Sequence, residues 1–225
     1  MKRIGIGALL CLVVAFVWFQ YPVKSGPACM PNCEGLDMSG QNLAGMSMRN
    51  GYFTQTNLQG ANLEAVSFFL GQLTRVNLRD ANLRNADLTA AILAEADLRG
   101  ADLTGAVLRG ADLRDADLRD AILIEADLRG ANLHEANLMR ADFSAAVLTE
   151  ANLNEANLRR ANLTGASLRR ADLRNSDLRR AVLDNADVTG ADFNGAFVDP
   201  PVIMTLGSAP AAVSLGSAPS APPLD

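Results

Sequence analysis

A leucine or another large apolar residue recurs at every fifth position over most of this 225-residue chain. The repeating units are centred on residues 38, 43, 48 and onward to 198, so (198 − 38)/5 + 1 gives 33 units without an insertion. Every centre therefore has a number ending in 3 or 8. We number the five positions of a unit so that the centre is position three. Position one is usually Ala and position two Asp or Asn, as in Ala101-Asp102-Leu103-Thr104-Gly105.

This period excludes the two common regular elements. On an α-helix, five residues advance about 500°, so successive leucines would not share a face. In a continuous strand they would alternate between faces. Within one unit, however, positions one and three point the same way in an extended segment, and positions two and four point the other way. Position five is often Gly, Asn, Asp or Arg, which suits a corner. We therefore predict a coil with Ala and Leu inside, stacked so that successive backbones pair.

The Ala-(Asp/Asn)-Leu-x-x pattern resembles the pentapeptide-repeat family over residues 36–199. The resemblance implies an all-β fold, a right-handed quadrilateral β-helix solenoid with four units per coil and about eight coils. At roughly 4.8 Å per layer, the rod would be about 40 Å long. The first units, such as Gly51-Tyr52-Phe53, and the last, such as Phe197-Val198, depart from the pattern. Atypical terminal coils are typical of solenoids.

Residues 1–25 have the layout of an export signal. Lys2 and Arg3 precede the apolar run Ile4–Phe19, and small residues would permit cleavage after Ser25. The alternative is a retained membrane anchor, with Gln20–Val23 extending the run toward the roughly 20 residues that span a bilayer. In either case we expect the repeat outside the cytoplasm, either periplasmic or extracellular, or anchored to the membrane.

Two further segments flank the predicted repeat. Residues 26–35 read as a linker that contains Cys29 and Cys33, for which export makes a disulfide plausible. Two free thiols are the alternative. Residues 200–225 begin with Pro200-Pro201, which would stop the ladder, and are rich in Pro, Ala and Ser, which predicts a disordered tail.

The predicted surface carries columns of charge, because residues twenty apart would stack in a four-unit coil. Residues 80–155 carry 15 acidic residues and 7 Arg, a net −8, whereas residues 159–180 carry 7 Arg and 2 Asp, a net +5. We predict a partner-binding site at Arg159, Arg160, Arg179 and Arg180. The alternative is mutual neutralisation of neighbouring Asp and Arg columns. In that alternative, Asp97, Asp117 and Asp177 lie beside the first arginine column, which consists of Arg79, Arg99, Arg119, Arg159 and Arg179. The other columns are Arg140, Arg160 and Arg180 at the adjacent corner, and the acidic Glu95, Asp115, Glu135 and Glu155 on another edge.

Sequence motifs for catalysis are lacking. There is no G-x-S-x-G or phosphate loop, and three Cys with one histidine, His134, are few for a zinc site. We therefore expect no enzyme activity, no cofactor and no metal. Ile122 and Ile124 would form a small outward apolar patch, and Asn162-Leu163-Thr164 matches a glycosylation sequon.

The predicted function is that of a non-catalytic, exported or membrane-anchored scaffold. Its partner would be a protein or an anionic envelope component, and nucleic acid is not expected. The resemblance also implies an alternative, because some family members mimic DNA and bind type II topoisomerases. This chain differs from such mimics in its export segment, its arginine columns and its Pro-rich tail.

Overall fold

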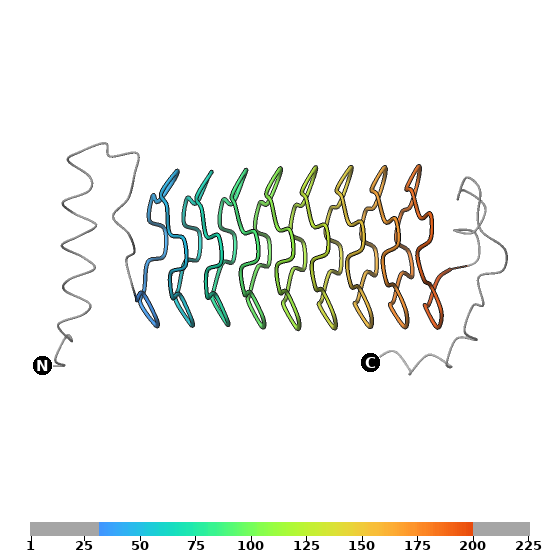
Figure 1. Ribbon diagram of the computed structural model, residues 1–225, viewed down its shortest axis with the longest axis horizontal. Helices are drawn as coiled ribbons and strands as arrows, with labels where there is room; N and C mark the ends of the chain where they lie inside the picture. Colours follow the sequence, from blue (N-terminus) through green and yellow to red (C-terminus); the bar gives the residue numbers. More distant parts are fainter. Residues whose placement is uncertain (1–31, 200–225) are drawn as a thin grey trace, which may run out of the picture.

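The computed structural model describes residues 32–199, which form one straight stack of coils (Figure 1). Within this range there is no helix and no strand longer than one residue. Instead, each position-two residue forms an isolated parallel bridge with the residue twenty positions later, as Asn57 does with Asn77. A register of twenty residues is four units per coil, which confirms the predicted four-sided coil. The 199 − 32 + 1 = 168 described residues make about eight coils, since 168/20 is 8.4.

The sides of the coil are short because positions four and five of every unit form a turn. Main-chain N–H groups of positions three and five donate to the next coil, position two donates to the previous coil, and position one closes the turn. Examples are Leu58 N to Asn77 O (2.7 Å), Gly60 N to Arg79 O (2.8 Å), Asn57 N to Leu36 O (2.8 Å) and Ala61 N to Leu58 O (3.1 Å). Four of the five N–H groups of a regular unit are thus satisfied by backbone.

The fifth N–H, at position four, is satisfied by the side chain at position two. Thr104 N donates to Asp102 Oδ1 at 3.0 Å, and Met139 N donates to Asn137 Oδ1 at 3.3 Å. This is the local contact that makes Asp and Asn favourable in turns. The Asp/Asn signature therefore has a structural role that its outward direction alone did not reveal.

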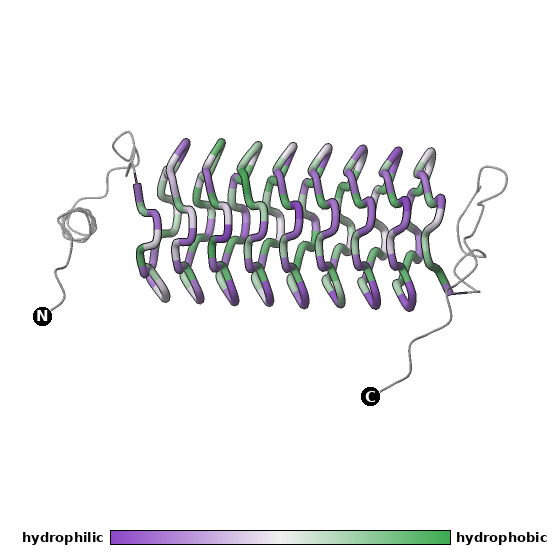
Figure 2. Tube along the Cα trace, turned by 90° about the horizontal axis from the view of Figure 1, so that it is seen from below, coloured by the Kyte–Doolittle hydropathy of each residue, from purple (hydrophilic) through white to green (hydrophobic). Residues whose placement is uncertain are grey.

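The core is a narrow column of stacked leucines bordered by alanines. Centres from Leu58 to Leu178 are fully buried, and each buried Leu contributes roughly 1.5–3 kcal/mol. Hydrophilic and hydrophobic residues alternate around every coil (Figure 2). Where Phe53 replaces a leucine, position one is Gly51, and a Cβ there would lie 2.5 Å from the Phe53 ring. The larger centre is accommodated by the smaller neighbour.

The corners share one unusual backbone conformation. All 33 position-five residues from 35 to 195 have φ between +53° and +73°, and only 11 of them are glycines. None is β-branched, which agrees with the steric cost of this region for such residues. Pro200 falls on the next corner position, and proline fixes φ near −65°. A proline therefore cannot adopt the conformation that these 33 corners share.

At the other end, the coil conformation is already present at Asn32, the first described residue, which precedes the predicted start at residue 36. Cys33 is fully buried and occupies a centre, with its main-chain N–H donating to Tyr52 O at 2.9 Å. Its predicted disulfide partner Cys29 lies outside the described residues, so the disulfide stays a prediction. The export segment 1–25 and the tail 200–225 also lie outside them. Residues 32–199 contain no helix that could span a membrane.

Candidate functional site

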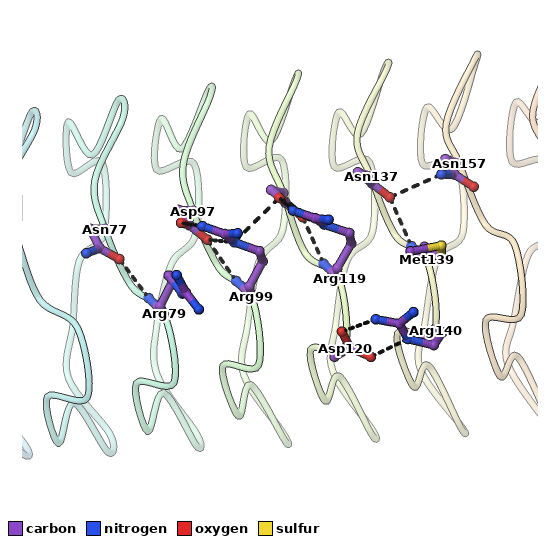
Figure 3. Close-up of polar contacts among 11 residues, drawn as sticks. Asn77, Arg79, Asp97, Arg99, Arg119, Asp120, Asn137, Met139, Arg140 and Asn157 are labelled. Atoms are coloured by element: carbon purple, nitrogen blue, oxygen red, sulfur yellow. Dashed lines mark hydrogen bonds and ion pairs between the residues drawn. The ribbon is translucent and has the colours of Figure 1, made fainter. Parts of the chain in front are cut away.

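The first arginine column is largely neutralised by the carboxylates beside it. Arg119 donates from Nε and Nη2 to Asp117 at 2.8 and 2.6 Å. Arg99 pairs with Asp97 in the same way and also lies 3.6 Å from Asp117, so it bridges two coils (Figure 3). Partial burial acts to raise the pKa of Asp97, but hydrogen bonds from Arg99 outweigh it and hold that pKa below its usual value. This confirms the predicted neutralisation for the middle of the column.

The four arginines of the predicted site do not form one uniform cluster. Arg179 is half-buried and donates from Nε to Asp177 Oδ1 at 2.8 Å, and Arg159 Nε lies 3.9 Å from Asp177 Oδ2. The hydrogen bond to Asp177 raises the pKa of Arg179. One carboxylate thus serves two of the four arginines, which leaves these two less available to a partner.

Arg160 and Arg180 differ from the other two. Both are exposed at position five of successive coils, and the N–H of Arg160 donates to Arg179 O at 3.1 Å. The main-chain N–H of Arg180 donates to Asp199 at 2.7 Å. Among the described residues, no carboxylate lies within ion-pair distance of either guanidinium. We call these two residues the arginine corner.

The lack of a carboxylate partner sets the arginine corner apart from the arginines around it. The stretch 159–180 contains five other arginines, and each has a carboxylate partner: Asp177 for Arg159 and Arg179, Asp187 for Arg169, Glu150 for Arg170, and Asp172 for Arg174. One coil earlier on the same corner, Arg140 pairs with Asp120 at 2.6 Å (Figure 3). Only the last two arginines of this corner column lack such a partner within residues 32–199.

Some carboxylates of the acidic column also have partners on the rod itself. Glu95 accepts a bidentate pair from Arg75 at 2.8 and 3.0 Å. Glu135 lies 3.1 Å from His134 Nε2, and the other ring nitrogen of His134 lies 3.0 Å from Asn154 O. His134 is therefore held by surface contacts between coils rather than aimed at a cleft. Over residues 32–199, no group of three or more His, Cys, Asp or Glu is placed to hold a metal ion.

The sequon asparagine belongs to a ladder between coils. Asn162 Nδ2 donates to Asp142 Oδ1 at 3.1 Å and to Ser144 Oγ at 2.8 Å, while its Oδ1 accepts from Thr164. Its amide is engaged in the rod itself, which disfavours attachment of a glycan.

The exposed apolar side chains lie partly where sequence reasoning did not place them. Ile122 is 37% exposed, in agreement with the predicted patch, and Ile124 is half-buried. Tyr52 and Leu70 are more exposed, at 54% and 43%. The signal for them was present in the sequence, since Tyr52 stands where most units have Asp or Asn and Leu70 stands at a corner. Sequence reasoning treated this region only as irregular.

Comparison with known proteins gives the following matches. The family model for pentapeptide repeats matches residues 32–68, 72–110, 111–146, 141–180 and 161–197. No curated protein sequence matches the chain. Among solved structures, HetL, a pentapeptide repeat protein involved in heterocyst differentiation regulation from the cyanobacterium Nostoc sp. strain PCC 7120, is 26% identical. That match covers 87% of this chain and 95% of HetL, with a TM-score of 0.52.

A second solved structure is less similar. QnrB1, a plasmid-mediated fluoroquinolone resistance protein, is 22% identical in its trypsin-treated form, with coverage of 76% of this chain and 90% of QnrB1 and a TM-score of 0.41. At this distance the likeness carries no functional argument. The match to HetL supports the fold, and the family implies that the four-sided coil is right-handed.

Proposed function

Because this chain belongs to the pentapeptide-repeat family, we propose that it is a non-catalytic binding scaffold, exported or anchored at the membrane, whose arginine corner docks an anionic partner. The observation that carries the proposal is that Arg160 and Arg180 are exposed on successive coils without a carboxylate partner among the described residues. The partner is an acidic protein or a polyanionic envelope polymer.

Physical chemistry favours these two arginines over their neighbours. A guanidinium binds carboxylate or phosphate through two parallel hydrogen bonds. An arginine already paired on the rod must first lose its own carboxylate, whereas Arg160 and Arg180 need not. Their backbones are fixed by the ladder at a separation of roughly 4.8 Å. Little backbone entropy is therefore lost when the two side chains meet a row of anions.

Export is supported by the N-terminal sequence alone. Lys2 and Arg3 followed by Ile4–Phe19 have the charge and length of an export segment. This segment lies outside the described residues, and delivery of the rod outside the cytoplasm is part of the proposal.

The test compares two double variants of the full chain. Arg160→Glu with Arg180→Glu is expected to weaken binding to immobilised poly-L-glutamate and to remove specific proteins or polymers from an envelope pull-down. The matched control is Arg169→Glu with Arg170→Glu. It changes the net charge equally, but it alters arginines that already have carboxylate partners. Circular dichroism confirms that both variants fold.

Salt provides an independent check. Binding through the arginine corner should weaken as ionic strength rises, because exposed charges are screened beyond about 8 Å at physiological salt. Unchanged binding of the Arg160/Arg180 variant would contradict the proposal. An equal loss in both variants would also contradict it, because net charge rather than the corner would then be responsible.

A further inference from the structure

Three neighbouring side chains form an apolar ridge near the N-terminal end of the rod. The ridge consists of Tyr52, Phe69 and Leu70. The Tyr52 backbone forms a bridge with Gln72, so Tyr52 lies one coil from Leu70 and beside the same edge. Phe69 and Leu70 are positions four and five of one unit and turn around that edge. Tyr52 and Leu70 are the two most exposed large apolar side chains between residues 32 and 199.

Both residues are unfavourable for the stability of the repeat itself. Leu70 has φ +56° and is the only large apolar residue among the 33 corners. A left-handed conformation costs a non-glycine residue roughly 1–2 kcal/mol, and exposure means that Leu70 gains little from packing. Tyr52 replaces the usual Asp or Asn, so the N–H of Thr54 has no hydrogen bond within the described part of the chain. The same backbone features recur at other non-glycine corners and in other units without Asp or Asn at position two, so the exposed apolar side chains themselves distinguish this end of the rod.

We propose that the apolar ridge contacts the bilayer that holds the N-terminal apolar segment. The inference rests on the anchored form of the proposed function. In the anchored form the apolar run extends to Val23, so eight residues, 24–31, separate it from the first described residue. At up to about 3.6 Å per residue they span at most about 29 Å, so the first coils stay close to the membrane surface.

The size and composition of the ridge favour lipid over a protein partner. A stable protein interface buries about 800 Å² on each partner, which three side chains do not provide. A tethered surface needs much less, because the tether makes the second contact intramolecular. Tyrosine is enriched at the membrane–water interface. The Arg49 guanidinium lies 4.2 Å from the centre of the Phe69 ring, where its charge can face phosphate while the ring enters the acyl region.

The register also places the arginine corner away from such a membrane. Residues 70 and 160 differ by 90 positions, which is four and a half coils of twenty residues. The half coil puts the two residues on diagonally opposite edges of the four-sided rod. A rod that rests on Leu70 therefore presents Arg160 and Arg180 away from the lipid, where they are free to bind the partner.

The test places one indole at the ridge of the full chain. Trp18→Phe removes the native tryptophan, and Tyr52→Trp places a single new one at the ridge. The protein with both substitutions is reconstituted into phosphatidylcholine–phosphatidylglycerol vesicles whose lipids carry bromine on their acyl chains. We expect bromine to quench the indole at residue 52, and Leu70→Gly to reduce that quenching. The matched control is Ile122→Trp in the same background, because Ile122 is an exposed apolar residue far along the rod; it should not be quenched.

Every outcome of this experiment decides the proposal. An unquenched indole at residue 52 overturns it; vesicle flotation of the same sample then tells whether only the ridge fails or whether the membrane segment fails too. Equal quenching at residues 52 and 122 also overturns it, because the two residues are three and a half coils apart and lie on opposite faces of the rod, so lipid contact would not be specific to the ridge. The paired variant Tyr52→Asn with Leu70→Gly should have a higher Tm than the wild type. A fall in Tm would mean that the two residues serve the fold instead.

Discussion

At the scale of single residues, the most informative side chain is the Asp or Asn at position two. Its side-chain oxygen accepts a hydrogen bond from the N–H of position four, which is the one main-chain N–H of a regular unit without a backbone partner. When it is Asn, the amide also donates to the coil below, as Asn77 does to Asn57 at 2.9 Å. Asp cannot donate, and stacked carboxylates repel each other, so arginines bridge them. Asp127, for example, accepts from Arg129 in its own unit and from Arg109 in the previous coil.

This bridging predicts a pH-dependent effect at Asp127, whose side chain is only 17% exposed. Hydrogen bonds from Arg129 and Arg109 outweigh partial burial and lower the pKa of Asp127 to about 2. A lowered pKa contributes stability that is present above the unfolded value of 3.8 and is lost as the pH falls through about 2. We expect Asp127→Asn, which keeps the turn hydrogen bond, to lower the free energy of unfolding by about 1–2 kcal/mol at pH 7.

Denaturant unfolding at several pH values checks this expectation. The difference between the wild type and Asp127→Asn should shrink toward zero near pH 2. Asp87→Asn is the control, because no arginine lies within ion-pair distance of Asp87 among the described residues, and the change should have little effect. A loss of stability at Asp127 that is the same at pH 2 and pH 7 would contradict the ionic explanation.

At the scale of the repeating element, the corner determines which substitutions the unit tolerates. Ala145 has φ +57° at an exposed corner. Ala145→Gly should raise the free energy of unfolding by about 0.5–1 kcal/mol, because relief of strain exceeds the added entropy of the unfolded chain. Ala145→Val should lower it, because a β-branched residue is most strained at positive φ.

Thermal unfolding of the two variants measures both effects. If Ala145→Val were as stable as the wild type, the corner would not be held in the left-handed conformation.

Much of the element was predictable from the sequence, and the reasons are physical. Alanine and leucine two residues apart can share only one face, so the interior followed from the period. The number of sides did not follow, because a period of five is compatible with coils of different size; it came from the family resemblance. The sequence also did not show which arginines form ion pairs, because this depends on the side-chain rotamers. Arg159 and Arg179 share Asp177, while Arg160 and Arg180 have no such neighbour among the described residues.

At the scale of the whole molecule, the rod is a one-dimensional stack in which each coil contacts only its neighbours. Leu128 is fully buried near the middle, and Leu183 lies in the last coil. We expect Leu128→Asp to cost about 4 kcal/mol or more, because a carboxylate would be buried without a partner. Leu183→Asp should only fray the end, since terminal coils unfold without disrupting the rest.

Circular dichroism and limited proteolysis of the two variants distinguish these outcomes. Leu128→Asp should lose the β spectrum, and Leu183→Asp should keep most of it and be trimmed from the C-terminal side. Equal damage from the two substitutions would mean that the rod unfolds as one unit and is not a sum of coils.

The proposed function requires that the rod displays its surfaces outside the cytoplasm, because the location determines which partners the arginine corner and the apolar ridge can meet. The most direct measurement is a reporter enzyme, active only outside the cytoplasm, fused after Asp225. We predict activity with the full chain and none after deletion of residues 2–20. A reporter that is silent with the N-terminal segment present, although the fusion is expressed, would place the rod in the cytoplasm and contradict the claim.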